Sequence, residues 1–469
     1  MGALFSLAGS KNMATDYHPI SQVDTSKRQR LSASIGDEDL RLIPSLPDEI
    51  SIQILARMPR VCYPTMKLVS RSWKATVMNH EIFQLRKELG TTEEWLYVLT
   101  KVEEDKLSWH ALDPLSGIWQ RLPPMPVVTY EDESKKSVAG LRVWNMMGFI
   151  KGWLGCGDSL DRMPFCGCAV GVVGGCLYVL GGFSRASAMR CVWKYDPCSN
   201  SWSEVAPMMV GRAYCKIGLL NNKLYVVGGV SRGRGGLTPL QSAEAYDPEL
   251  GLWTQVPSMP FSRAQDLPTA FLIDMLKPIA TGMTSYRGKL YVPQSLYSWP
   301  FFVDVGGEIY DPVTNTWFEM PAGMGEGWPA RQAGTKLSVV VDGELYSLDP
   351  SSSLDSGKIK VYDHQDDIWK VVLGKVPILD FTDSESPYLL AGFLGKLHVI
   401  TKDIENNIVI LQAELRKDKA VIASTSSSTS SSSSCDGDQV KGTESNDWKT
   451  IASRSFGNAE LVSCQILNI

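Results

Sequence analysis

The chain of 469 residues lacks the features that mark several large classes of protein. Lys and Arg (46) nearly balance Asp and Glu (51), for a net charge of −5, so no basic excess favours nucleic-acid binding. No run of about 18 apolar residues occurs, which argues against a membrane-spanning helix. No secretory signal is seen at the N-terminus. We therefore expect an intracellular protein, in the cytoplasm, the nucleus or both.

Residues that carry chemistry are few or scattered. The ten cysteines show no paired CxxC spacing, so we interpret them as reduced thiols and expect no metal site. There are five histidines, and no nucleophile–base motif or phosphate-binding loop is recognisable. These absences favour a binding protein over an enzyme, and we expect no cofactor.

The chain does contain a repeat of about 50 residues, a period typical of propeller proteins. In each copy an apolar strand precedes a Tyr-Asp-Pro turn, or a variant of it, and then a Trp. The two sharpest copies are Cys176–Gly182 with Tyr195–Pro197 and Trp202, and Lys223–Gly229 with Tyr246–Pro248 and Trp253. Weaker copies start at Leu96, Leu290, Leu345 and Leu397 and end at Trp119, Trp317, Trp369 and Trp448. The sequence therefore predicts six units.

The residue types in the repeat predict how the units pack. Strands that are apolar on both faces suit sheets packed between neighbouring sheets. A Gly pair ends the strand where backbones crowd, and Asp-Pro marks the next turn. The Trp is large enough to fill the wedge between two sheets, so its removal should cost about 3–5 kcal/mol. Together these features predict an all-β propeller over residues 95–469.

The first unit is one strand short, because no apolar strand precedes Leu96. The chain ends in an unassigned apolar run, Ala459–Ile469, which we expect to complete that unit and close the ring. Two inserts interrupt the repeat. The insert at about 130–165 is rich in large apolar residues, which pack either on the propeller or on a partner. The insert at about 423–445 is rich in serine and is expected to be a mobile loop.

Residues 43–90 have helical periodicity, and we predict three helices there. Ser45 followed by Asp48 is a capping signal, Pro47 suits the first turn, and Pro59 ends the first helix. Gly90 closes the last helix. A segment of this size has a marginal core, so it is expected to dock on a partner.

Residues 1–40 are polar and are expected to be a disordered leader. The start, Met1–Ser6, satisfies the N-myristoylation pattern, which makes Gly2 a candidate for acylation and weak membrane association. The alternatives are a leader that matches this pattern by chance and a nuclear import signal at Lys27–Arg30.

The segment reads LPDEI from Leu46, ILARMP from Ile54 and LVSRSWKA from Leu68. These residues resemble the F-box, and with the repeat the chain is similar to plant F-box/kelch-repeat proteins. The resemblance implies a small all-α F-box followed by a kelch propeller, and a substrate receptor of an SCF-type cullin–RING ubiquitin ligase. The F-box would bind a Skp-type adaptor, and through it a cullin, while the propeller would hold an unidentified target protein. The matching, adaptor-binding positions are Leu46, Pro47, Ile50, Ile54, Leu55, Pro59, Leu68, Val69 and Trp73.

Loops of a propeller carry function on a rigid scaffold, so we look for the target site there. Arginine suits an acidic or phosphorylated peptide because it binds such groups in a bidentate manner. The alternative is that each arginine pairs with a local carboxylate. The candidate target-binding residues are Arg185, Arg190, Arg212, Arg232, Arg234, Arg263, Tyr297, Trp299 and Arg331.

Two other functions remain open. A kelch scaffold that binds its adaptor without a cullin has the same sequence features. Some kelch propellers are copper oxidases, but these need His and Tyr ligands brought together. The five histidines are His18, His80, His110, His364 and His398, and the last three belong to separate units, so we expect no such activity.

Overall fold

The structure is a computed structural model, and it describes residues 41–102, 106–126, 166–184, 187–233, 236–261, 279–298, 301–328, 337–349, 357–374, 376–377, 388–414 and 447–469. The chain divides into two compact units, Met1–Leu55 and Ala56–Ile469. The predicted leader with Gly2 and the predicted inserts at 130–165 and 423–445 lie outside the described residues, so these predictions stay untested.

The N-terminal region is helical, as predicted, but it is divided more finely. Its elements are α1 (Asp48–Arg57), η2 (Arg60–Cys62), α2 (Tyr63–Met66), α3 (Arg71–Met78) and α4 (His80–Glu88). The apolar spacing of Met66, Val69 and Trp73 predicts a single second helix, but the structure breaks it between Met66 and Arg71. Ser70 causes this break, because its side chain accepts a hydrogen bond from the Trp73 backbone N–H at 3.0 Å and so caps α3. Apolar residues continue at helical spacing across the break, so the sequence pattern alone predicts one continuous helix.

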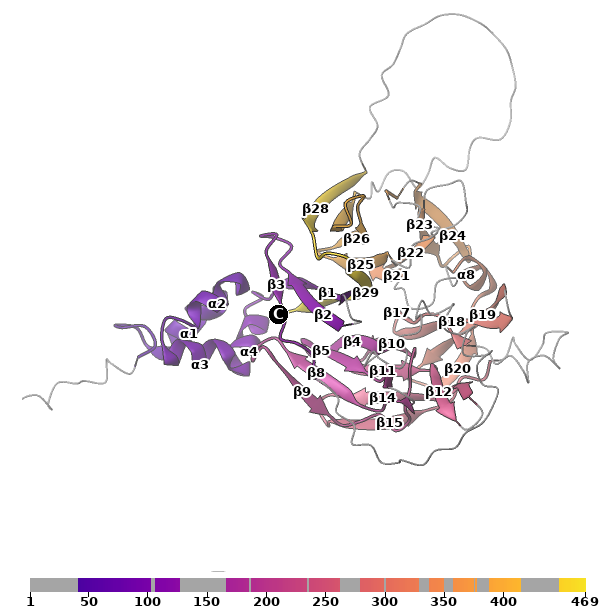
Figure 1. Ribbon diagram of the computed structural model, residues 1–469, viewed down its shortest axis with the longest axis horizontal. Coiled ribbons are helices and arrows are strands. Elements are labelled where there is room, and N and C mark those ends of the chain that lie inside the picture. The colour runs from indigo at the N-terminus through magenta and orange to yellow at the C-terminus, as the bar shows by residue number, and fades with distance from the viewer. Residues whose placement is uncertain are drawn as a thin grey trace, which may run out of the picture. The chain divides into compact units, whose positions relative to one another are not determined.

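The remaining described residues form six sheets of at least four strands each, arranged as the blades of a propeller (Figure 1). In order from the inner strand outward, the blades are as follows. Blade 1 is β29 (Glu460–Asn468), β1 (Glu94–Val102), β2 (Lys106–Leu112) and β3 (Trp119–Arg121). Blade 2 is β4 (Ala169–Val173), β5 (Cys176–Leu180), β8 (Val192–Asp196) and β9 (Ser201–Val205). Blade 3 is β10 (Lys216–Leu220), β11 (Lys223–Val227), β14 (Ala243–Asp247) and β15 (Leu252–Val256).

Blade 4 is β16 (Ile279–Ala280) and β17 (Thr284–Tyr286), both paired with β18 (Lys289–Ser298), then β19 (Phe301–Asp311) and β20 (Thr316–Glu319). A short helix, α8 (Ala322–Gly327), follows it. Blade 5 is β21 (Ser338–Val341), β22 (Glu344–Asp349), β23 (Lys358–Asp363) and β24 (Ile368–Leu373). Blade 6 is β25 (Leu389–Phe393), β26 (Lys396–Lys402), β27 (Ile408–Ala413) and β28 (Trp448–Arg454). The predicted number of six units is confirmed.

The ring closes through the last strand of the chain, which confirms the prediction for Ala459–Ile469. β29 pairs antiparallel with β1, with Leu96 opposite Ile466 and Val98 opposite Cys464. It is the inner strand of blade 1, so β1 has a hydrogen-bonded neighbour on each side. Blade 1 is therefore built from both ends of the propeller sequence.

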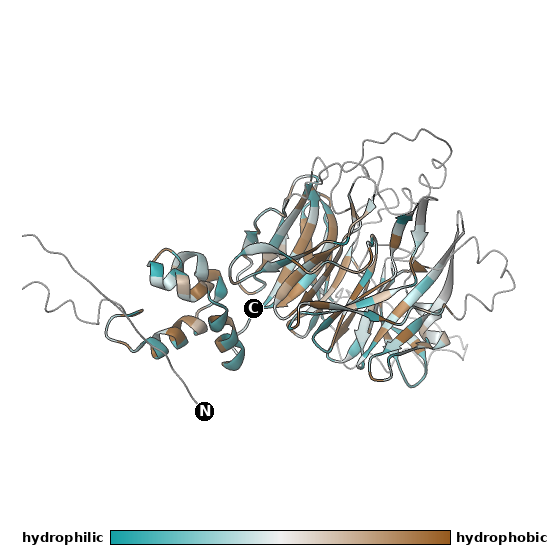
Figure 2. Cartoon of the chain, turned by 90° about the horizontal axis from the view of Figure 1, so that it is seen from below, coloured by the Kyte–Doolittle hydropathy of each residue, from teal (hydrophilic) through white to brown (hydrophobic). Residues whose placement is uncertain are grey.

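The repeated Tyr and Trp join neighbouring strands and neighbouring blades. In blade 2, Tyr195 of β8 lies opposite Trp202 of β9, with ring centroids 5.2 Å apart. The Trp202 indole N–H donates to the Pro123 carbonyl, which follows blade 1, at 3.0 Å. Equivalent bonds join Trp253 to Ala206, Trp317 to Pro257 and Trp369 to Met324. These bonds confirm that Trp fills the junction between blades. Figure 2 shows that hydrophobic residues are concentrated in the strands.

The Gly pair has the predicted role in blades 2 and 3. Gly181 and Gly182 have φ of 59° and 92°, which side chains rarely adopt. A Cβ on Gly181 would lie 2.2 Å from the Arg212 carbonyl oxygen of the next blade. Glycine is therefore required where the segment entering blade 3 crosses blade 2.

Candidate protein-binding sites

The first unit exposes apolar side chains on α1. Ile50 and Ile54 are four residues apart, so they share one face of the helix, and they are 45% and 40% exposed. Pro47 is exposed and Leu46 is half-buried just before this helix. Leu55 is only 1% exposed, so its prediction as an adaptor-binding residue is wrong. Leu55 follows Ile54 directly in α1, but its side chain points to a different side of the helix and is buried in the core.

The second unit exposes further apolar side chains in the break between α2 and α3. Leu68 is 85% exposed and Val69 is 59% exposed, although their backbone N–H groups bond to the carbonyls of Thr65 and Met66. Their geometry is therefore fixed while their side chains face solvent. Pro59 is also exposed, and Trp73 is half-buried. Ordered, exposed apolar groups of this kind mark partner-binding surfaces.

Three neighbouring blades extend the connection between their second and third strands into hairpins. In blade 2 it forms β6 (Phe183–Ser184) and β7 (Ser187–Ala188), and in blade 3 it forms β12 (Val230–Gly233) and β13 (Gly236–Pro239). In blade 4 the strands β18 and β19 themselves continue to Ser298 and Phe301. Because the second strands of all blades run in the same direction, these hairpins lie on one face of the ring.

Two of the predicted target-binding residues lie on described strands of the hairpins, and a third follows one of them. Arg232 lies on β12 and is half-buried, and Tyr297 lies on β18 opposite Phe302. Arg190 follows β7, is exposed, and donates from Nε to the Met208 carbonyl at 2.6 Å. Five candidates lie outside the described residues, namely Arg185, Arg234, Arg263, Trp299 and Arg331. The structure thus brings Arg190, Arg232 and Tyr297 to one face and leaves the target site untested.

Arg212 is not available to a target. Its side chain is 1% exposed, and its Nε donates to Glu244 Oε1 at 2.8 Å. Its other nitrogens donate to the carbonyls of Gly228 and Ser242 and to the Ser242 hydroxyl, at 2.8–2.9 Å. Arg212 therefore follows the alternative interpretation, local pairing with a carboxylate, and its prediction as a target-binding residue is wrong.

Glu93 connects the last helix to the first blade. Its Oε1 accepts hydrogen bonds from Arg86 Nη2 and from the Arg60 backbone N–H, each at 2.9 Å. Its Oε2 accepts from the Trp95 indole at 3.0 Å, and its backbone pairs in both directions with Ile469. Arg86 is 1% exposed and Glu93 is 18% exposed, so this ion pair is largely shielded from water. The helices η2 and α4 are thereby tied to blade 1 and to its closing strand.

The same helices contact the turns of blade 2. Phe83 packs so closely on Gly175, between β4 and β5, that a Cβ there would lie 2.6 Å from its ring. The Arg60 guanidinium donates to the Pro197 carbonyl, between β8 and β9. Cys198, next in that turn, is 4% exposed, whereas Val313 at the equivalent position of blade 4 is 89% exposed. Blade 2 thus differs from the repeat where the helices cover it.

Sequence reasoning missed this junction. Its residues belong to no motif and come from segments far apart in the sequence. One sequence signal could have indicated it. The residue after Asp-Pro is a cysteine, Cys198, in blade 2, but it is Glu249 in blade 3 and Val313 in blade 4.

Comparison with known proteins agrees with these features. Residues 43–85 match the F-box domain family, and residues 164–209 and 211–260 match the Kelch motif family. The F-box/kelch-repeat protein At1g22040 of Arabidopsis thaliana is 61% identical over 480 aligned residues, which cover 100% of both chains. This chain belongs to the F-box/kelch-repeat family.

Two more distant relatives are also named as F-box proteins. The F-box/kelch-repeat protein At1g67480 of Arabidopsis thaliana is 28% identical over 78% of this chain and 82% of its own. The F-box protein AFR of the same species is 28% identical over 66% of this chain and 68% of its own. Among the helices that the structure describes, none is long and apolar enough to span a membrane.

Proposed function

We propose that this protein is the substrate-recognition subunit of an SCF-type ubiquitin ligase. The observation that carries the proposal is the set of exposed apolar residues in the F-box, with Ile50 and Ile54 on α1 and Leu68 and Val69 after α2. A Skp-type adaptor that covers them would gain about 1.5–3 kcal/mol for each fully buried side chain. The chain itself would supply binding, and the cullin-bound machinery would supply chemistry.

The propeller would hold the target on the face that carries the three hairpins. Since neighbouring strands are antiparallel, the connection between the second and third strands lies at the opposite edge from the other two turns of a blade. Phe83 and Arg60 contact those other turns, at Gly175 and Pro197. The hairpin face is therefore free of α4, and the arginines on it suit an acidic or phosphorylated segment of the target.

The test is co-purification of adaptor and cullin with the full-length chain. Wild type should retain both, and Leu46→Ala/Pro47→Ala should retain neither. Val313→Ala is the control, because Val313 is 89% exposed in a propeller turn and should not affect adaptor binding. A folded wild type that binds neither protein would refute the proposal. Retention of the adaptor without the cullin would instead support a scaffold that acts outside a ligase.

A further inference from the structure

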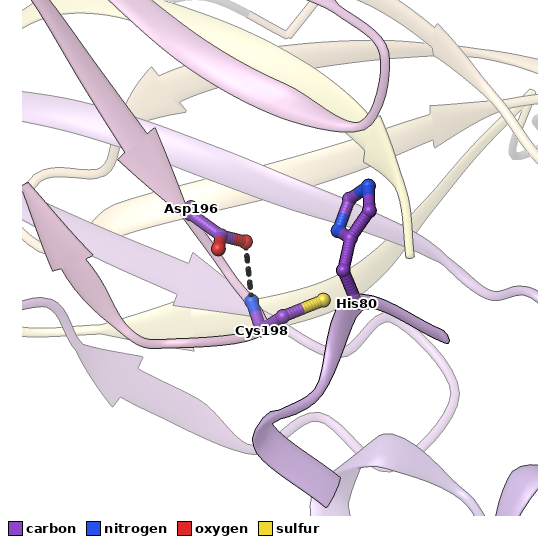
Figure 3. A group of neighbouring side chains, drawn as sticks. All are labelled: His80, Asp196 and Cys198. Atoms are coloured by element: carbon purple, nitrogen blue, oxygen red, sulfur yellow. Dashed lines mark hydrogen bonds between the residues drawn. The ribbon is translucent and has the colours of Figure 1, made fainter. Parts of the chain in front are cut away.

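Three side chains capable of binding a metal converge where α4 meets blade 2. They are His80, the first residue of α4, Asp196, the last residue of β8, and Cys198 in the turn that follows. Their donor atoms all lie within 4.8 Å of one another. Figure 3 shows the Asp196 carboxylate and the Cys198 thiol pointing toward His80. Among the described residues, no other group of three His, Cys, Asp or Glu side chains meets this distance.

We propose that His80, Asp196 and Cys198 form a zinc site that links the F-box helices to the propeller. Zinc accepts this mixture of nitrogen, oxygen and sulfur ligands, and a fourth position would be open to water. Tetrahedral bonds of about 2.0–2.3 Å place donor atoms roughly 3.3–3.7 Å apart, so the present donors need to converge by roughly 1 Å. A movement of this size can come from side-chain rotation alone.

Two of the ligands are held in place by their surroundings. Cys198 is 4% exposed, and its backbone N–H donates to Asp196 Oδ1 at 2.8 Å. Ser199 Oγ donates to Asp196 Oδ2 at 3.1 Å. Such bonds orient a carboxylate and still leave lone pairs for a metal. The blade therefore offers a carboxylate and a thiol in a fixed arrangement.

His80 is the ligand whose side chain would move to bring the three donor atoms to zinc-binding distance. Its side chain is exposed, it stacks on Phe83 with ring centroids 5.7 Å apart, and its Nε2 lies 3.5 Å from Gln84 Nε2, a weak contact. Rotation about its side-chain bonds can bring a ring nitrogen toward the other donors without moving the backbone. Asn79 caps α4 by accepting from the Glu81 N–H, so the start of the helix is fixed.

The charge balance is compatible with a divalent ion. Zinc would displace the thiol proton to solvent, and the Cys198 thiolate and Asp196 carboxylate would neutralise its two positive charges. Arg60 also lies against this thiol and repels a cation. However, its N–H groups can donate to a metal-bound thiolate, as ligand-supporting groups do in known sites. With a neutral metal–ligand set, the charges left near the site are the positive charges of Arg60 and Lys67.

Zinc and cobalt titration of the purified, reduced full-length chain tests the proposal. Wild type should bind one Zn²⁺, and Co²⁺ in its place should give a sulfur-to-cobalt charge-transfer band in the near ultraviolet. Cys198→Ser should remove the band. Cys191→Ser is the matched control, since Cys191 is half-buried in blade 2 outside the cluster, and it should keep the band. Mg²⁺ and Ca²⁺, which prefer oxygen ligands, should not compete.

The His80→Ala variant keeps the test decisive if Cys198→Ser fails to fold. His80 is exposed, so its removal gives up only the stacking on Phe83 and should cost little stability. It should bind Zn²⁺ at least tenfold more weakly than wild type and lose the zinc-dependent rise in melting temperature. Unchanged zinc affinity in His80→Ala, or no zinc binding by wild type, would overturn the proposal. Neither measurement depends on adaptor binding, so failure here leaves the proposed function untouched.

Discussion

At the scale of single residues, the Arg212–Glu244 pair ties the entry of blade 3 to its third strand. Both side chains are at most 2% exposed, and Arg212 donates four hydrogen bonds. Removal of one partner leaves the other as an unpaired buried charge, which costs more than the pair itself contributes. The arginine therefore acts on the stability of the propeller.

We predict that Arg212→Ala and Glu244→Ala each lower the free energy of unfolding by about 3–5 kcal/mol, measured by urea denaturation. The control is Arg190, which is exposed and makes one hydrogen bond, to the Met208 carbonyl; Arg190→Ala should lower the free energy of unfolding by only about 0.5–1.5 kcal/mol. If Arg212→Ala were as stable as wild type and lost only target binding, the structural role assigned to Arg212 would be wrong.

His398 should make the propeller sensitive to acid. The side chain is fully buried, its ring stacks on Phe393 with centroids 3.7 Å apart, and its Nδ1 lies 3.1 Å from the Lys396 carbonyl oxygen. Burial lowers the pKa of His398 to about 4, against about 6.5 in an unfolded chain. Between these values the unfolded state binds the proton and the folded state does not, so stability falls as pH falls.

The expected loss from His398 approaches about 1.4 kcal/mol per pH unit between about pH 6.5 and pH 4. Urea denaturation of wild type and His398→Gln at about pH 7.5 and about pH 5 measures it. Wild type should lose more stability than the variant over this interval. The exposed His364 is the control, and His364→Gln should follow wild type. Equal pH dependence of wild type and His398→Gln would contradict the prediction.

At the scale of elements, β29 decides whether the ring is closed. Leu467 lies opposite Trp95 and is fully buried in a cluster that includes Leu99 and Leu177 of blades 1 and 2. The next residue, Asn468, is exposed. The two adjacent residues of β29 therefore give a buried position to test and an exposed position as its control.

We predict that Leu467→Ala lowers the free energy of unfolding by about 2–5 kcal/mol, as expected for a buried leucine. Asn468→Ala should change it by less than about 0.5 kcal/mol. Thermal and urea unfolding of the full-length variants measures both effects. A Leu467→Ala variant with wild-type stability would show that β29 is not needed in blade 1.

How far these elements could be predicted depends on how local their signals are. The strands, the glycine pairs and the tryptophans could be predicted from the repeat. Each copy lies between two similar sheets, so the same residue types are needed at the same positions. The break at Ser70 was missed because a single side-chain cap interrupts apolar spacing that otherwise continues through it. The pairing of Arg212 with Glu244 depends on two segments 32 residues apart, and no local pattern fixes that contact.

At the scale of the whole molecule, adaptor binding and the stability of the propeller should be separable. Pro47 is exposed and Leu46 is half-buried, and neither belongs to the buried hydrophobic clusters of the blades. In the co-purification experiment, Leu46→Ala/Pro47→Ala should therefore lose the adaptor and keep the melting temperature of wild type. A lower melting temperature of the propeller in this variant would mean that loss of adaptor binding reports unfolding.

The position of β29 also has a consequence for biosynthesis. β1 leaves the ribosome early, but its inner partner, Glu460–Asn468, follows only after residues 103–459 have been made. Blades 2 to 6 can form during translation, whereas blade 1 must wait with the inner edge of β1 unpaired. A premature stop codon shortly before residue 460 would release a protein with intact F-box helices and an open ring. Such a truncated protein would carry the proposed adaptor-binding residues on a propeller that lacks its closing strand.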